Sequence, residues 1–166
     1  MGSRRIRRSG NQQMTNAQML KTVRDAVAKV TDPEYPEVTI EQLGILERVF
    51  STGESICIDL VPTRSGCPAL EVIRTDVLAA AKDVGATSVS VKFCSDPVWT
   101  PDRITEDARH ILAREFFVVI RNVDGSSKCP MCENSELENR SDVGSTPCRS
   151  VSWCAECRNP IEVIRR

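Results

Sequence analysis

The sequence predicts an α+β protein in which a small mixed sheet packs with helices and a cysteine-rich ribbon follows. Helical and strand-like hydrophobic patterns alternate from residue 16 to residue 120. Five of the eight cysteines fall after residue 122, where the apolar content decreases. At 166 residues, the chain suits one domain of roughly 100–150 residues and a small appendage. We therefore expect a flexible basic tail at 1–13, an α+β domain at 14–122 and a four-cysteine ribbon at 123–166.

The first helix is expected over residues 16–30. Thr15 and Gln18 form a capping box, which marks a helix N-terminus. Asp32 and Pro33 end the helix, because proline disfavours a helical conformation in the residue before it. The apolar side chains recur at helical spacing: Leu20, Val23, Val27 and Val30.

Extended segments follow this helix. Residues 34–41 are expected to be extended, and two strands are expected at 43–51 and 55–61. The Thr-Gly-Glu turn at 52–54 joins these strands as a hairpin. In the second strand the apolar residues Ile56, Ile58 and Leu60 share one face, so Cys57 points to the other.

The pattern continues with a helix, a strand, a helix and a final short strand. The second helix is expected at 68–84, because proline is favoured at the first helical position and Gly85 suits the C-terminus. A strand at 87–94, a helix at 106–114 capped by Thr105 and a last strand at 116–120 complete the α+β domain. Trp99, in a proline-flanked loop, is either a lid over the sheet end or an interface anchor.

Composition excludes several classes of function. The single histidine, His110, argues against histidine-rich metal catalysis and a Ser–His–Asp triad. The net charge of −1 and the 4% aromatic content argue against nucleic-acid binding. No apolar run approaches the roughly 18–20 residues of a membrane span, and no apolar segment of a secretory signal follows the arginines of the tail. We therefore expect a cytoplasmic protein whose cysteines act as metal ligands or reactive thiols rather than disulfides.

Two Cys-X-X-Cys pairs indicate a metal site. They are separated by 21 residues, close to the roughly 15–20 residues of four-thiolate zinc sites. Each pair places two sulfurs on one side of a tight turn, and a segment this short needs a metal to fold. A structural zinc ribbon is the favoured interpretation, and an iron–sulfur cluster, local disulfides or free thiols are the alternatives. The ligands are Cys129, Cys132, Cys154 and Cys157, with Cys148 as an alternative ligand.

Cys67 is the candidate reactive thiol of the α+β domain. It lies at the expected N-cap of the second helix, where unpaired backbone N–H groups and the helix dipole favour a thiolate and lower the pKa of the thiol. Gly66 permits close approach of a metal, a cluster or a partner, and Arg64 adds positive charge. A small residue packed under the loop is the alternative interpretation.

Other polar residues carry weaker signals. Asp32 and Glu34 could orient a site, but spacing alone favours a turn. Cys57 and Cys94 lie on expected strands, where buried core thiols are the ordinary outcome.

Several motifs in order resemble the PaaD/SufT-like iron–sulfur assembly family. They are DPEYP at 32–36, LGI at 43–45, PTRSGCPA at 62–69 and DPVWTPDRIT at 96–105. The ribbon motifs CPMC at 129–132 and GSTPC at 144–148, with the final cysteine pair, look like the PaaD subunits encoded with phenylacetyl-CoA epoxidase (ring 1,2-epoxidase). The resemblance covers residues 16–166, although Arg64 stands where tyrosine is common in the family.

The resemblance implies a fold and a set of site residues. It implies an iron–sulfur assembly-type α/β domain with a zinc ribbon behind it. Cys67 would be the cluster-associated thiol, supported by Asp32, Glu34 and Gly66, and the ribbon cysteines would be metal ligands. Cys148 belongs to the family pattern as well.

We therefore expect a non-catalytic accessory protein that matures iron–sulfur clusters or metal centres for a phenylacetyl-CoA epoxidase-type oxygenase in phenylacetate catabolism. The implied cofactors are structural zinc and a transient iron–sulfur cluster or iron. The implied partners are oxygenase or reductase subunits and the assembly machinery, with no nucleic acid and no membrane, and a homodimer stays open. The alternatives are a stoichiometric structural subunit of the oxygenase and a zinc-ribbon nucleic-acid adaptor, which only the arginine tail favours.

Overall fold

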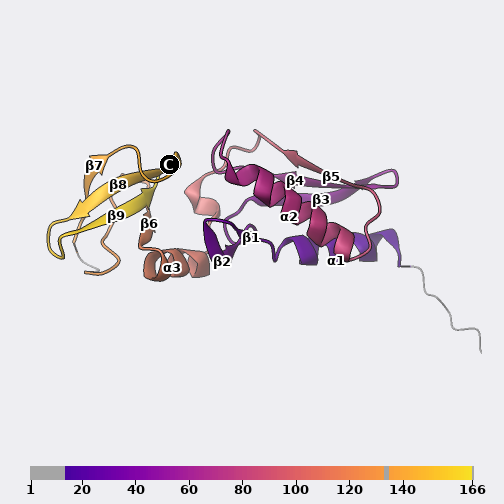
Figure 1. Cartoon of the computed structure of the whole chain (residues 1–166), viewed down its shortest axis with the longest axis horizontal. Coiled ribbons are helices and arrows are strands. Elements are labelled where there is room, and N and C mark those ends of the chain that lie inside the picture. Colours follow the sequence, from indigo (N-terminus) through magenta and orange to yellow (C-terminus); the bar gives the residue numbers. More distant parts are fainter. Residues whose placement is uncertain (1–13, 133–134, 166) are drawn as a thin grey trace, which may run out of the picture.

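A computed structural model describes residues 14–132 and 135–165 of the chain, so the predicted basic tail lies outside the described residues. The chain forms two lobes next to each other along its long axis (Figure 1). The larger lobe holds the first helices and strands, and the smaller lobe, here called the ribbon, holds a C-terminal sheet. No helix in the described ranges is long and apolar enough to cross a membrane.

The larger lobe is built on a three-stranded mixed sheet. The strands β3 (Leu46–Thr52) and β4 (Ser55–Leu60) form the predicted hairpin, and β5 (Val89–Phe93) pairs parallel to β4. Helix α2 (Ala69–Asp83) is the crossover that parallel pairing requires. The apolar face of β4 packs with both helices, and its predicted alternation is confirmed.

Helix α1 (Asn16–Val27) begins as predicted, with the complete Thr15 and Gln18 capping box. It ends three residues before the predicted end at residue 30. The reason is tertiary: the Val30 carbonyl accepts a hydrogen bond of 2.8 Å from the Ile40 backbone N–H. This bond extends the hairpin of β1 (Thr31–Asp32) and β2 (Tyr35–Thr39), which occupies most of the segment predicted to be extended.

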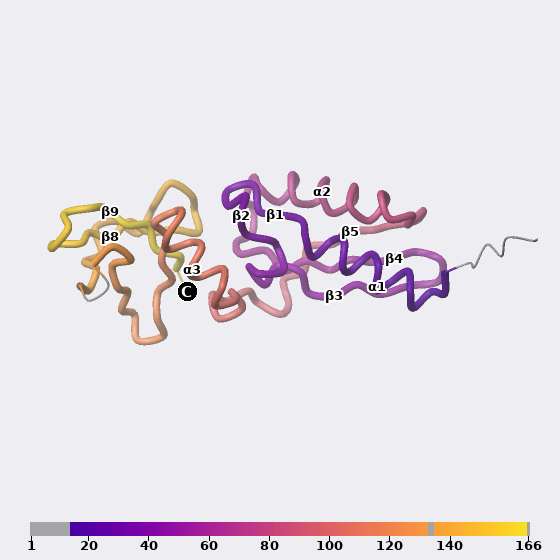
Figure 2. The backbone as a smooth tube through the Cα atoms, turned by 90° about the horizontal axis from the view of Figure 1, so that it is seen from below, coloured from indigo at the N-terminus to yellow at the C-terminus, as the bar shows by residue number. Residues whose placement is uncertain are grey.

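The chain reaches the ribbon through a 3-10 turn, η1 (Pro101–Arg103), and α3 (Glu106–Glu115). Thr105 caps α3 as predicted, by accepting from the Ala108 backbone N–H. In the view of Figure 2, α3 lies between the two lobes.

The ribbon sheet has the order β6-β9-β8-β7. These strands are β6 (Val118–Ile120), β7 (Glu138–Ser141), β8 (Arg149–Cys154) and β9 (Asn159–Ile164). The predicted strand at 116–120 therefore exists, but it pairs parallel to β9 and is not part of the sheet of the larger lobe. The predicted division at 122/123 stays a prediction, and β6 lies before it.

Alternation along β6 explains why this strand joins the ribbon. Val118 is buried in the large core together with Ile164 of β9, whereas Val119 packs on the small core around Ile161. Successive side chains of a strand point to opposite faces, so one strand can serve two cores. The two lobes therefore share apolar packing across the ribbon sheet.

Gly44 brings the η1 turn against the start of β3. Its φ of +67° is in the left-handed region, and a Cβ there would lie 2.3 Å from the Arg103 Cβ. The Gly44 carbonyl accepts a bond of 2.8 Å from Arg103 Nε, and the Arg103 guanidinium also pairs with Glu47. The LGI motif thus has a steric reason for its glycine.

We expect Gly44→Ala to lower the free energy of unfolding by about 3 kcal/mol or more, because backbone strain and a clash add. Gly53→Ala is the matched control: φ there is +61° and nothing lies within 4 Å of the added Cβ. Its cost should be only the roughly 1–2 kcal/mol of the left-handed backbone. Denaturant unfolding of both variants measures the difference, and equal losses would show that the contact with Arg103 is unimportant.

Candidate functional site

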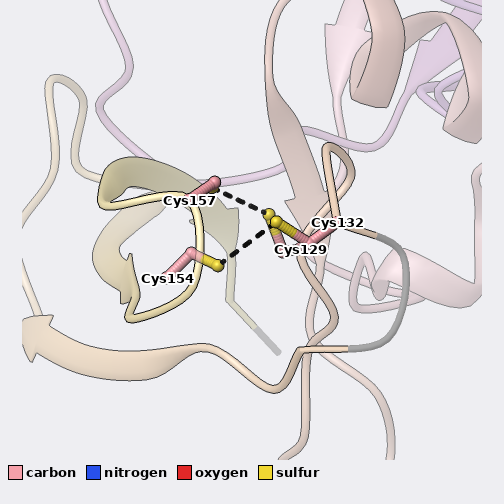
Figure 3. Close-up of side chains that lie close together, drawn as sticks. All are labelled: Cys129, Cys132, Cys154 and Cys157. Atoms are coloured by element: carbon pink, nitrogen blue, oxygen red, sulfur yellow. Dashed lines mark hydrogen bonds between the residues drawn. The ribbon is translucent and has the colours of Figure 1, made fainter.

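Four cysteines of the ribbon converge on one point. Cys129 and Cys132 lie in the loop after β6, Cys154 ends β8 and Cys157 lies in the turn before β9. Their four Sγ atoms all lie within 4.8 Å of one another, and all four are free thiols (Figure 3). Cys129 and Cys157 are 3.7 Å apart, and Cys132 and Cys154 are 3.9 Å apart.

These distances fit one tetrahedral metal ion. Bonds near 2.3 Å to a central ion space the sulfurs about 3.8 Å apart, whereas a disulfide requires about 2.05 Å. The ligands of a multi-iron cluster bind different iron atoms and spread further apart, so the arrangement favours a single ion over the cluster alternative. Burial of Cys129 and Cys154, at 1% and 0% exposure, closes the site to solvent.

The thiols differ in acidity. A hydrogen bond from the Asn159 side chain lowers the pKa of Cys157 to about 7. Burial and the neighbouring thiols raise the pKa of Cys132 to about 12. Four thiolates at these distances repel one another, so a cation among them is what allows all four to ionise.

Cys67 lies just before α2, but two expectations about it are wrong. Pro68 is the N-cap, so the helix begins one residue later than predicted. Burial raises the pKa of the Cys67 thiol, although the Ala69 backbone N–H acts in the opposite direction. Desolvation of the charged form outweighs the helix terminus here.

The negative neighbours of Cys67 raise its pKa further and reveal a second cluster. They are Glu34, Cys148 and Asp32, so the larger lobe and the ribbon both contribute groups near this thiol. Cys148 is not one of the four converging ribbon thiols, and its Sγ lies 3.1 Å from Thr146 Oγ1. The structure thus separates Cys148 from the ribbon group and brings it to the Cys67 side of the junction between the lobes.

Asp32 and Glu34 serve both as a turn and as a site. Asp32 Oδ1 accepts a bond of 2.8 Å from the Glu34 backbone N–H, which is the turn that spacing favours. Asp32 is only 7% exposed, and burial raises the pKa of its carboxyl group. Glu34 forms an ion pair of 3.2 Å with Arg149 of the ribbon. Gly66, with φ of +79°, lines the groove beside Cys94 and Trp99.

A small cavity of about 30 Å³ lies at the junction and shares its walls between the lobes. Tyr35 lines it beside Cys148, and the buried Tyr35 hydroxyl has no hydrogen-bond partner within the described ranges. Trp99 lines it as well and donates from its indole nitrogen to the Leu43 carbonyl at 2.9 Å.

Sequence reasoning missed Tyr35 and Arg149 as site residues and left Trp99 undecided. Tyr35 lies inside the DPEYP motif, and Arg149 follows Cys148 directly, so adjacency to the motifs was the available signal. Cys57 and Cys94 are half-buried rather than core thiols. The Cys57 thiol contacts Ser90 and Thr52 on the side of the sheet away from the apolar face.

Fold and thiols together define a protein class: an α+β domain with a cysteine before its crossover helix, followed by a four-thiol ribbon. Residues 20–93 match the family described as iron-sulfur cluster assembly protein. Residues 117–165 match the family described as PaaD zinc beta ribbon domain.

A curated relative from Escherichia coli (strain K12) is similar along most of the chain. Its name makes it one of the subunits of a 1,2-phenylacetyl-CoA epoxidase. It is 34% identical over 146 residues, which cover 84% of this chain and 88% of the relative. The chain therefore belongs to the PaaD family, and the resemblance found in the motifs is confirmed.

Solved structures support the fold of the larger lobe. A domain of unknown function, DUF59, from Bacillus anthracis is similar with a TM-score of 0.52 and 24% identity, covering 58% of this chain and 92% of that chain. A conserved hypothetical protein, TM0487, from Thermotoga maritima has a TM-score of 0.47 and 26% identity over 58% of this chain and 91% of that one. The predicted α+β class is confirmed.

We expect Cys129→Ser to reduce the bound metal from about one ion per chain to almost none, because three thiolates and a hydroxyl no longer close the site. The ribbon should then lose protection against amide hydrogen exchange in β8 and β9. Cys57→Ser, which changes a thiol far from the group, should keep full metal content and protection. Metal analysis after dialysis measures the first effect, and an unchanged metal content in Cys129→Ser would contradict the assignment.

Asp32→Asn should stabilise the fold at neutral pH. The asparagine keeps the Oδ1 acceptor for the Glu34 N–H and removes a buried charge. Because the folded-state pKa of Asp32 is raised, the wild type gains stability as pH falls through that pKa, so the advantage of the variant should shrink in acid.

Thermal unfolding of both proteins at neutral and acidic pH tests this. The control is Asp25→Asn, which removes an exposed i,i+4 pair with Lys21 and should change stability by less than about 0.5 kcal/mol at neutral pH. A variant Asp32→Asn that is less stable than wild type at neutral pH would show that the ionised carboxylate is a structural necessity.

Proposed function

We propose that this chain is a non-catalytic accessory protein that transiently holds iron or an iron–sulfur cluster and delivers it to an oxygenase of the phenylacetyl-CoA epoxidase type. The observation that carries the proposal is the position of Cys67: half-buried, with Asp32 and Glu34 as its acidic neighbours. Thiol and carboxylate groups are the ligands that iron takes from proteins. The match to the iron–sulfur assembly family and the name of the E. coli relative support the same role.

The ribbon has a different task in this proposal. Its four thiols hold zinc, and a closed four-thiolate zinc site performs no chemistry. The zinc replaces the hydrophobic core that so short a segment cannot build, and it fixes a surface on which a partner docks. The partners are oxygenase or reductase subunits and the assembly machinery. Eight cysteines, none in a disulfide among the described residues, support action in the reducing cytoplasm.

Cys67→Ser should leave the fold intact and abolish activation of the client. The thiol is half-buried, so the smaller, similar hydroxyl costs little stability, but it does not replace a thiolate toward iron. The measurement is the activity of the epoxidase system when it is assembled in cells that make only this variant of the protein. Cys57→Ser is the matched control and should activate the client fully.

A structural component of the oxygenase is the second candidate, because the name of the E. coli relative places it among the epoxidase subunits. In that case the chain would co-purify with the complex at a fixed ratio, and Cys67→Ser would give a fully active complex. That single result would exclude iron handling at Cys67 and favour the structural role.

A further inference from the structure

The junction between the lobes holds a second thiol near Cys67. Cys148 comes from the ribbon, directly before β8, and its charge acts on Cys67 across the junction. The two loops are also joined directly. Arg64, three residues before Cys67, donates a bond of 2.7 Å to the carbonyl of Pro147, the residue before Cys148.

Further contacts on the ribbon side fix the position of Cys148. Its carbonyl accepts from the Arg165 backbone N–H at 3.2 Å, and the Arg165 guanidinium also donates to the Pro147 carbonyl at 2.8 Å. On its other side Arg149 pairs with Glu34 of the larger lobe. Cys148 is therefore tied to both lobes, and its thiol is placed by the tertiary structure rather than by a free loop.

The surroundings have room and unused polar capacity. A groove of about 310 Å³ is lined by Thr63, Arg64, Trp99, Cys148 and Arg165. The neighbouring cavity is lined by Cys148 and by Tyr35, whose hydroxyl is buried with no partner among the described residues, although the residue is only 5% exposed. A buried hydroxyl without a partner costs free energy, which a ligand in this cavity would recover.

We propose that Cys148 supplies the second thiolate of the iron site to which Cys67 contributes the first, so that iron is held between the two lobes. This inference rests on the proposed function and adds the ribbon to the site itself. Binding replaces the two S–H protons by S–Fe bonds, and the protons pass to the solvent. Two protein thiolates leave coordination positions free, which a client needs when it takes over the metal, whereas the four-thiol zinc site has none.

The arginines beside Cys148 suit such cargo. Arg64, Arg149 and Arg165 surround the GSTPC segment, and two of them already donate to its backbone. Iron bound by two thiolates, and more so an iron–sulfur cluster, carries negative charge on its sulfur atoms, which these guanidinium groups stabilise.

Anaerobic titration with Co²⁺ tests the site in the full-length, zinc-loaded chain. Thiolate ligands give Co²⁺ an absorption in the near ultraviolet that increases with the number of thiolates. The wild type should bind one Co²⁺ beyond its zinc with a two-thiolate signal, and added Fe²⁺ should compete. Cys148→Ser should halve the signal and weaken binding at least about tenfold, as loss of a metal-supporting group does. Cys57→Ser should behave as wild type, and zinc content should stay unchanged throughout.

The outcomes separate this inference from the function on which it rests. If Cys148→Ser binds Co²⁺ as wild type does while Cys67→Ser loses it, the role of Cys148 is refuted and that of Cys67 stands. If both serine variants bind as wild type does, the metal is elsewhere and both fail. Arg64→Ala guards against misfolding of the serine variant: it removes only the bond to Pro147, so it should weaken binding yet keep the two-thiolate signal at saturation.

Discussion

The ion pairs of Arg149 hold together what the rest of the structure needs. Its side chain is 10% exposed, and it joins Glu162 of the ribbon at 2.5 Å to Glu34 of the larger lobe at 3.2 Å. Its guanidinium also lies 4.7 Å from the centre of the Tyr35 ring. Burial alone would raise the pKa of Glu162, but hydrogen bonds from Arg149 and Ser145 outweigh it and lower the pKa. A charge this buried is tolerable only with such partners, so the junction has one preferred geometry.

Two thiol sites with opposite properties follow from this geometry. The four-thiol group lies within one sheet, where two tight turns face each other and bury their sulfurs. The junction thiols come from different lobes and stay half-buried beside carboxylates. The first arrangement suits a metal that stays, because it offers a closed shell. The second suits a metal that leaves, because part of its shell is open.

Local features of this chain could be predicted from sequence, and long-range features could not. The capping box of Thr15, the cap of Thr105 and the hairpin turn after Thr52 depend on neighbouring residues, and all three were predicted. The convergence of the paired cysteines follows from spacing, which also acts locally in each turn. The partner of β6, the position of Cys148 and the raised pKa of Cys67 depend on how the lobes meet, and no spacing encodes that.

The division of β6 between two cores has a consequence for how this architecture can be recombined. Val118 packs with the larger lobe and Val119 with the ribbon, so the strand has no linker-like character. Cutting the chain before β6 would uncover the apolar side of α3 and β2, and cutting after it would deprive β9 of its neighbour. The ribbon is therefore not an interchangeable cassette. Gene fusions or deletions that separate it from the α+β part would lose an interior, and the two parts are expected to be inherited as a single unit.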